Sequence, residues 1–345
     1  MIATPGKLVT LLVGETKKNW SGTPVSEMRE GHSAPSYIGV IPMPELIETF
    51  KQNISGADIS FRVKGYAPNI IIVEGTRDVV DIFGEQVIDI KKQMLTASGD
   101  VLARYDAYKG FEEEYGVFCV AQYKKQPEDE FRSRFPRIAG LIKSEKEPLD
   151  EREIHRTMES SIKYGKDDLL IADWDGAFVF NQSGRFDEAI GLCELINVQL
   201  LRYRILDFEL DRRLRKLIRL LNSGHVRKFG IFRAKELKEA IREIIQTRSR
   251  SLIEFEAVER NVKLIGDWYS AKVFAMLEKK FHLEEWRRHV KEKFEALGDV
   301  YAMASENFSL SFSKRMDIVL IFGWLFLLAG WFVLFVFDLL KFLRS

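Results

Sequence analysis

The stretch IVLIFGWLFLLAGWFVLFVF, residues 318–337, decides the organisation of this chain. It contains twenty consecutive residues without an ionisable or amide side chain, and seven of them are Phe or Trp. A helix rises about 1.5 Å per residue, so this segment spans roughly 30 Å, the thickness of a bilayer's hydrocarbon core. We therefore expect one transmembrane helix, with the lipid bilayer as its partner.

Charged residues return on both sides of this apolar segment. Lys314 and Arg315 mark the expected membrane entry, and further basic residues follow the segment, so the distribution of positive charge does not orient it. The apolar run from Leu8 to Val13 is interrupted by Glu15 and is too short for a signal peptide. We expect a single-pass protein whose N-terminal domain is cytoplasmic, in a bacterial inner membrane rather than a mitochondrial one.

Composition limits the remaining choices. The chain has 345 residues, of which 46% are apolar, enough for a folded domain besides the membrane segment. Its 52 basic and 51 acidic residues leave no global charge that would indicate a nucleic-acid or lipid-surface partner. Cys119 and Cys193 lie in apolar patterns and are expected to be buried, reduced thiols. Five scattered histidines have no metal-ligand spacing, so we expect no metal and no cofactor.

Residues 1–183 are predicted to form an α+β domain. Short β-like runs alternate with Gly, Pro and Asn: 37–41, 59–63, 70–73, 101–108 and 117–123. Two helices are expected, one over residues 44–53 and one over residues 150–162, where Asp150 is followed three residues later by Glu153. Residues 169–173 and 177–180 flank a Trp-Asp-Gly turn, which predicts a β-hairpin.

From residue 184 the apolar period becomes helical. Three long stripes, over 192–221, 237–276 and 283–308, alternate steps of three and four residues, which predicts a helical hairpin or coiled-coil-like stalk over 184–315. Residues 222–230 supply one reversal, and residues 279–282 a second reversal or a kink. The transmembrane helix is expected over 316–340, with a short tail at 341–345, and the third stripe runs into it without a break. Packing of the stripes predicts a homo-oligomer.

This order of elements resembles the meiotic-nuclear-division-type family of membrane-anchored proteins of unknown function, over about residues 110–340. The likeness rests on Tyr115 to Cys119 with the acidic residues 128–130, the acidic helix from Asp150, the hairpin pattern up to Trp268, the stripe 282–297, and Ser313 to Asp317 at the membrane entry. The last segment departs from the family, where a His-rich turn and a Trp are expected. The resemblance implies an inner-membrane protein facing the cytosol or matrix, often self-associating, with relatives linked to mitochondrial translation, and no established catalytic residues.

One string has an enzyme-like form. Asp173 and Asp175 follow an apolar strand in the pattern Asp-x-Asp-Gly, which in haloacid-dehalogenase-type phosphatases presents a nucleophile, its acid partner and bound magnesium. The same residues suit a hairpin turn. We expect a tail-anchored scaffold or interaction protein without catalytic activity and with no identified small-molecule substrate; the alternative is a membrane-bound, metal-dependent phosphohydrolase that uses this pair.

A basic stretch is the second candidate site. Residues 202–233 hold ten basic and three acidic side chains. The candidates for binding an anionic partner are Arg212, Arg213, Arg215, Lys216, Arg219, Arg227 and Lys228. They could contact the phosphates of RNA, as in a ribosome, or anionic lipid headgroups. Alternatively, they pair with acidic runs on the neighbouring predicted helix, as the flanks of coiled coils do.

Overall fold

The structure is a computed structural model that describes residues 3–18, 20–25, 44–223, 239, 242 and 268–344. The chain divides into two compact units, Met1–Glu209 with Ser249–Val290, and Leu210–Arg248 with Lys291–Ser345. The first unit is the α+β domain predicted from the sequence. The predicted strand at 37–41 and most of the second apolar stripe lie outside the described residues, as does the reversal after residue 223.

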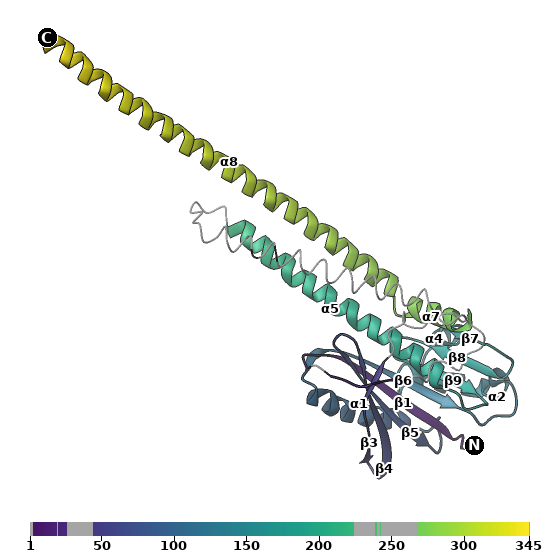
Figure 1. Cartoon of the computed structure of the whole chain (residues 1–345). Helices are drawn as coiled ribbons and strands as arrows, with labels where there is room; N and C mark the ends of the chain where they lie inside the picture. Colours follow the sequence, from purple (N-terminus) through teal and green to yellow (C-terminus); the bar gives the residue numbers. More distant parts are fainter. Residues whose placement is uncertain are drawn as a thin grey trace. The chain divides into compact units, whose positions relative to one another are not determined.

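A nine-stranded sheet forms the centre of the first unit, in the order β2-β3-β4-β5-β1-β6-β9-β8-β7 (Figure 1). Neighbouring strands are antiparallel except β6 and β9, which are parallel. The strands are β1 (Gly6–Thr16), β2 (Thr23–Pro24), β3 (Glu45–Ile54), β4 (Ala57–Tyr66), β5 (Ile70–Val79), β6 (Ala107–Val120), β7 (Ser161–Ile162), β8 (Asp168–Ala172) and β9 (Gly176–Asn181). The run Leu8–Val13 is thus the buried core of β1, the central strand between β5 and β6.

Helices alternate with strands along the first unit, and two of them continue into the second. They are α1 (Val87–Arg104), α2 (Pro127–Glu130), a 3₁₀ turn (Arg132–Arg134), α3 (Phe135–Ile142), α4 (Glu151–Glu159), α5 (Asp187–Ser223), α7 (Trp268–Lys280) and α8 (Leu283–Arg344). Asp150 caps α4 by accepting a hydrogen bond from the Arg152 backbone N–H, which confirms the predicted helix start. α5 and α8 each begin in the first unit and end in the second.

The sheet is covered on both faces, because successive side chains of a strand point to opposite sides. On one face, Phe61, Val73 and Phe178 belong to the large core cluster that α1 and α3 complete. On the other face, strand residues including Tyr66 and Ile72 pack against Val198 and Leu201 of α5. The first unit is therefore a three-layer arrangement of helix, sheet and helix (Figure 1).

Two local predictions were wrong. Residues 44–53 are not helical: β3 pairs with β4 through a two-residue turn in which Ser55 and Gly56 have φ of 52° and 79°. That turn type favours a hairpin, and the pairing outweighs the helix-like spacing of Leu46, Ile47 and Phe50. Residues 101–104 end α1 rather than beginning a strand. Val101 and Leu102 are buried one to two turns beyond Met94 and Ala97, a helical period that a short window does not reveal.

The hairpin of β8 and β9 is confirmed, with Ala172 paired to Ala177. The break predicted near residues 279–282 is also confirmed: α7 ends at Lys280, His282 has a φ of 50°, and α8 begins at Leu283. α8 then runs without interruption for 62 residues. In the described part of the chain, its segment Asp317–Val336 is the one stretch of helix long and apolar enough to cross a membrane, and none of it is buried.

Close backbone packing of β6, β9 and α3 requires a glycine in β9. A Cβ atom at Gly176 would lie 2.7 Å from the Gly116 carbonyl oxygen and 3.0 Å from that of Ile142. We predict that Gly176→Ala lowers the free energy of unfolding by about 1–3 kcal/mol, because backbone atoms cannot move aside cheaply. Urea denaturation of the full chain in detergent, followed by Trp fluorescence, measures this.

Gly99→Ala is the matched control. Gly99 lies inside α1, and an added Cβ there meets no atom within 4 Å. Alanine should leave stability unchanged or raise it by up to about 1 kcal/mol through helix propensity. Equal effects of the two substitutions would contradict the packing argument.

Candidate functional site

The Asp-x-Asp-Gly string forms the turn between β8 and β9, and its first carboxylate is held by several neighbours. Asp173 accepts hydrogen bonds from Lys143 Nζ at 2.8 Å and the Trp174 backbone N–H at 2.9 Å, with Thr157 Oγ1 at 3.5 Å. Lys280 Nζ of α7 lies 3.8 Å away. Burial alone would raise the pKa of Asp173, but the hydrogen bonds from Lys143 and the Trp174 N–H, together with the attraction of Lys280 and Lys143, lower it.

Asp175 lies in a different environment. Burial raises the pKa of its carboxyl, against the attraction of Lys91. The Lys91 ammonium donates to the Asp175 backbone carbonyl at 3.1 Å and to Ser144 Oγ at 2.6 Å, so it joins the turn to the end of α3. Burial lowers the pKa of Lys91. Among the described residues, no three His, Cys, Asp or Glu side chains are grouped as metal ligands.

The same turn also contacts the residues between α7 and α8. The Trp174 ring stacks on Phe281 with centroids 5.5 Å apart, and the Tyr115 ring also packs against Phe281, with centroids 5.6 Å apart. The Tyr115 hydroxyl donates to the Asp173 carbonyl at 3.0 Å. Phe281 and His282 form the break between α7 and α8. These contacts hold the residues just before α8 against β6 and the turn between β8 and β9.

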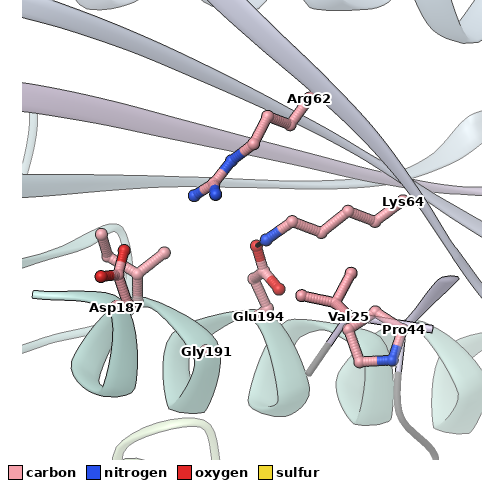
Figure 2. Close-up of a pocket in the computed structure, with 8 residues that line it drawn as sticks. Val25, Pro44, Arg62, Lys64, Asp187, Gly191 and Glu194 are labelled. Atoms are coloured by element: carbon pink, nitrogen blue, oxygen red, sulfur yellow. Dashed lines mark hydrogen bonds and ion pairs between the residues drawn. The ribbon is translucent and has the colours of Figure 1, made fainter. Parts of the chain in front are cut away.

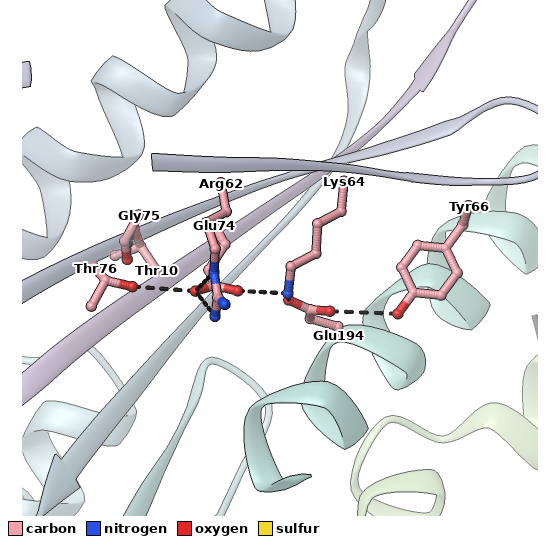
Figure 3. Close-up of polar contacts among 8 residues, drawn as sticks. All are labelled: Thr10, Arg62, Lys64, Tyr66, Glu74, Gly75, Thr76 and Glu194. Atoms are coloured by element: carbon pink, nitrogen blue, oxygen red, sulfur yellow. Dashed lines mark hydrogen bonds and ion pairs between the residues drawn. The ribbon is translucent and has the colours of Figure 1, made fainter. Parts of the chain in front are cut away.

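A buried charge network, defined by Arg62, Lys64, Glu74 and Glu194, lies between the sheet and α5 (Figure 3). Lys64 Nζ donates to Glu74 at 2.7 Å and to Glu194 at 2.6 Å. Arg62, directly opposite Glu74 in the ladder of β4 and β5, donates to the same carboxylate at 2.7 and 3.0 Å. Thr76 and Tyr66 extend the chain of contacts at its two ends, at 3.2 and 3.4 Å.

The two carboxyls of the buried charge network have opposite pKa shifts. Burial works to raise the pKa of Glu74, but the attraction of Lys64 and Arg62 prevails and lowers it to about 2. Glu194 is fully buried, which raises its pKa to about 7 although Lys64 attracts the ionised form. Lys64 stays charged, because its attraction to Glu194 and Glu74 overcomes its own burial and raises its pKa. One ammonium therefore serves two carboxyls of different proton affinity.

A narrow hollow that opens to solvent lies beside this network. It is lined by Val25, Pro44, Arg62, Lys64, Asp187, Ile190, Gly191 and Glu194. Figure 2 shows Lys64 and Glu194 pointing toward each other beside it. Gly191 lies one turn before Glu194 on α5. The Glu194 side chain lines this hollow although it is 0% exposed.

The basic candidates belong to the second unit. Arg212, Arg213, Arg215, Lys216 and Arg219 lie on α5, where Arg212, Arg215 and Arg219 are exposed. Their neighbour Asp211 pairs with Lys293 of α8 at 2.7 Å. Arg227 and Lys228 lie outside the described residues. Lys314 and Arg315 are in α8, but their side chains are outside the described set. Asp173 and Asp175 belong to the first unit.

The buried charge network was missed in the sequence, although signals for it exist. Arg62 and Lys64 alternate with Phe61 and Val63, so the strand period places both basic residues on one face. Glu74 directly follows the apolar run Ile70–Val73. Glu194 stands inside the most apolar part of α5, residues 189–201, where an ionisable side chain needs a partner. Their mutual contact depends on which helix covers which face of the sheet.

Known proteins resemble this chain over most of its length. Residues 17–187 match the family model described as the N-terminal domain of uncharacterized protein MJ0711. The chain is 28% identical to uncharacterized protein MJ0711 of Methanocaldococcus jannaschii over 302 residues, which cover 88% of this chain and 89% of that protein. No solved structure matches. These similarities relate the chain to a family of uncharacterised proteins.

We predict that Glu74→Gln destabilises the protein by about 3–5 kcal/mol, since it leaves the buried Lys64 and the partly buried Arg62 without their shared counter-charge. Urea denaturation of the full chain in detergent measures the loss. Asp89→Asn is the control, because its ion pair with Lys146 is solvent-exposed and should matter little. A Glu74→Gln variant as stable as Asp89→Asn would contradict the assigned charges.

Proposed function

We propose that this protein is a single-pass, membrane-tethered interaction protein whose α+β head lies in the cytoplasm. One observation carries the proposal: in the segment Asp317–Val336, fifteen large apolar side chains are each 51–81% exposed. Removing such a side chain from water is worth roughly 1.5–3 kcal/mol. Together they outweigh the net stability of a folded domain, about 5–15 kcal/mol. Insertion of this segment into a bilayer would remove these side chains from water.

The orientation is supported by the N-terminal apolar run. Leu8–Val13 is the buried centre of β1, hydrogen-bonded on both sides, so it has a structural role inside the head. A head that folds around this strand fits synthesis and retention on the cytoplasmic side. The resemblance to the meiotic-nuclear-division-type family supports the same anchored arrangement and a role without catalysis.

The hairpin geometry favours this proposal over the phosphohydrolase alternative. Magnesium-dependent attack needs the Asp173 carboxylate to be available to metal and substrate. In the structure, Asp173 is occupied by Lys143, the Trp174 N–H and Thr157, and it helps to hold the corner before α8. The string that suggested chemistry therefore suits a clamp between the sheet and the long helix.

The basic residues of α5 fit a partner in water better than lipid headgroups. Asp211 is level with Lys293 on α8, and Lys293 precedes Asp317 by 24 residues. At a rise of about 1.5 Å per residue, this places Asp211, the residue before Arg212, roughly 36 Å along α8 from the start of the apolar segment. That distance exceeds the Debye length of about 8 Å at physiological ionic strength, beyond which lipid charge is screened. An acidic surface such as RNA is the better match.

Two arginines within the apolar segment test the tether. We predict that Leu325→Arg with Leu328→Arg moves the full chain out of alkali-resistant membrane pellets, because each Arg at the centre of a span costs about 2.5–3.5 kcal/mol on insertion. The control is Glu295→Arg with Asp299→Arg, two exposed positions earlier on α8. Recovery of the unmodified protein in the soluble fraction, without detergent and unaggregated, would refute the tether.

Self-association is part of the same proposal. Gly323 and Gly330 lie seven residues apart, and a Cβ added at either meets no atom within 4 Å, so two such helices can approach closely there. We predict that Gly323→Leu with Gly330→Leu reduces chemical cross-linking in native membranes, whereas Ala329→Leu, on a neighbouring face, does not. A strictly monomeric unmodified protein would contradict this part.

A further inference from the structure

Glu194 is a titratable side chain that fastens one element of the protein to another. It lies on the sheet-facing side of α5, is 0% exposed, and meets Lys64 and Tyr66 of β4. Glu74 of β5 shares the same Lys64 ammonium. α5 begins against the sheet in the first unit and continues into the second. The contact of Glu194 therefore holds the N-terminal part of α5 on the sheet.

The charge balance of this contact changes with one proton. With Glu194 ionised, the two carboxylates balance Arg62 and Lys64, but a second carboxylate must then be kept away from water. With Glu194 protonated, Lys64 still has Glu74 as its partner at 2.7 Å. The ionised form of a buried carboxyl bears the larger desolvation cost. The docked helix therefore favours the protonated form, and both Glu194 and Lys64 line the hollow beside the contact (Figure 2).

Several groups near Glu194 have pKa values that are shifted away from neutral pH. In the described part of the chain, the titratable and charged side chains around Glu194 include Arg62, Lys64 and Tyr66 of β4, Glu74 of β5, Cys119 of β6, and Asp187 and Cys193 of α5. The pKa of Glu74 is lowered to about 2, and the pKa values of Lys64, Tyr66 and both thiols are raised. Between pH 5 and pH 8, Glu74, Lys64, Tyr66 and both thiols therefore keep their charge, whereas Glu194 changes its own.

We propose that Glu194 makes the docking of α5 on the sheet a proton-sensitive latch, closed when the carboxyl is protonated and loosened when it ionises. The sign follows from linkage. In the docked state the pKa of Glu194 is about 7, whereas a hydrated glutamate has an ordinary value of 4.5. The docked state binds the proton more tightly, so docking is strongest toward pH 5 and weakens as pH rises through 7. Through this titration, the pH of the cytoplasm would set how firmly α5 is docked on the sheet.

Hydrogen–deuterium exchange of the full chain in detergent tests the latch. Exchange rates of peptides from 187–209 and from β4 and β5 are measured between pH 5 and pH 8 and corrected for the intrinsic pH dependence of exchange. The opening constant of these peptides should rise on the order of fiftyfold across this range, as expected for a pKa that changes from about 7 to 4.5 on opening. An opening constant that does not change with pH in the unmodified protein overturns the proposal.

Substitutions then test whether the pH dependence of exchange comes from Glu194. Glu194→Gln keeps the size and hydrogen-bonding ability of the side chain but cannot ionise, so the pH dependence should disappear. Asp187→Asn, which changes a second carboxyl of the same hollow, should keep it. If Glu194→Gln does not fold, Tyr66→Phe replaces it: loss of the hydroxyl that donates to Glu194 should move the midpoint to higher pH. Persistence of the full pH dependence in Glu194→Gln, or an unmoved midpoint in Tyr66→Phe, overturns the assignment.

Discussion

The packing of α5 on the sheet depends on the ion pairs that the Lys64 ammonium makes with Glu74 and Glu194. This ammonium lies between carboxyls contributed by β5 and α5, so one side chain ties two strands and a helix together. A buried ion pair adds little net stability compared with apolar packing, but it leaves few acceptable alternatives, because a displaced partner would be a buried charge without compensation. A slide of α5 by one turn would separate Glu194 from Lys64. The apolar contacts of Val198 and Leu201 with the sheet supply the attraction, and the charges select the position.

The turn between β8 and β9 illustrates how the same residues can suit two purposes. Acidic side chains at a strand end can hold a metal ion, and they can also accept hydrogen bonds that rigidify a turn. Here Asp173 receives an ammonium, a hydroxyl and a backbone N–H, while Trp174 and Tyr115 enclose Phe281. Lys91 holds the other end of the turn. Because these contacts come from β6, α1, α3, α4 and α7, the turn joins most of the first unit to the beginning of α8.

The two units solve different solvation problems. In the first, the central strands such as β1 and β5 are buried on both faces, and Lys64 and Glu74 are paired where water is excluded. In the second, the final part of α8 exposes apolar side chains all round. A helix of that kind satisfies its own backbone hydrogen bonds and is suited to a hydrocarbon solvent. The proposed protein would join a proton-sensitive head to a membrane-spanning helix. Within the head, the contacts of Phe281 hold the start of α8, and the Glu194 contact holds the start of α5.

The sequence by itself determined the elements whose signal is local. The apolar segment after Asp317, the Asp150 cap, the hairpin at Asp173 and the break before Leu283 were all predictable, because period, cap and turn chemistry act over a few residues. β3 was missed because its pairing with β4 outweighs its own spacing. Only the tertiary structure decided that Lys64, Glu74 and Glu194 meet, since residues 130 positions apart come together only once α5 covers one face of the sheet. Burial and the neighbouring charges then shift the pKa values of Glu74 and Glu194, and no local sequence pattern specifies these shifts.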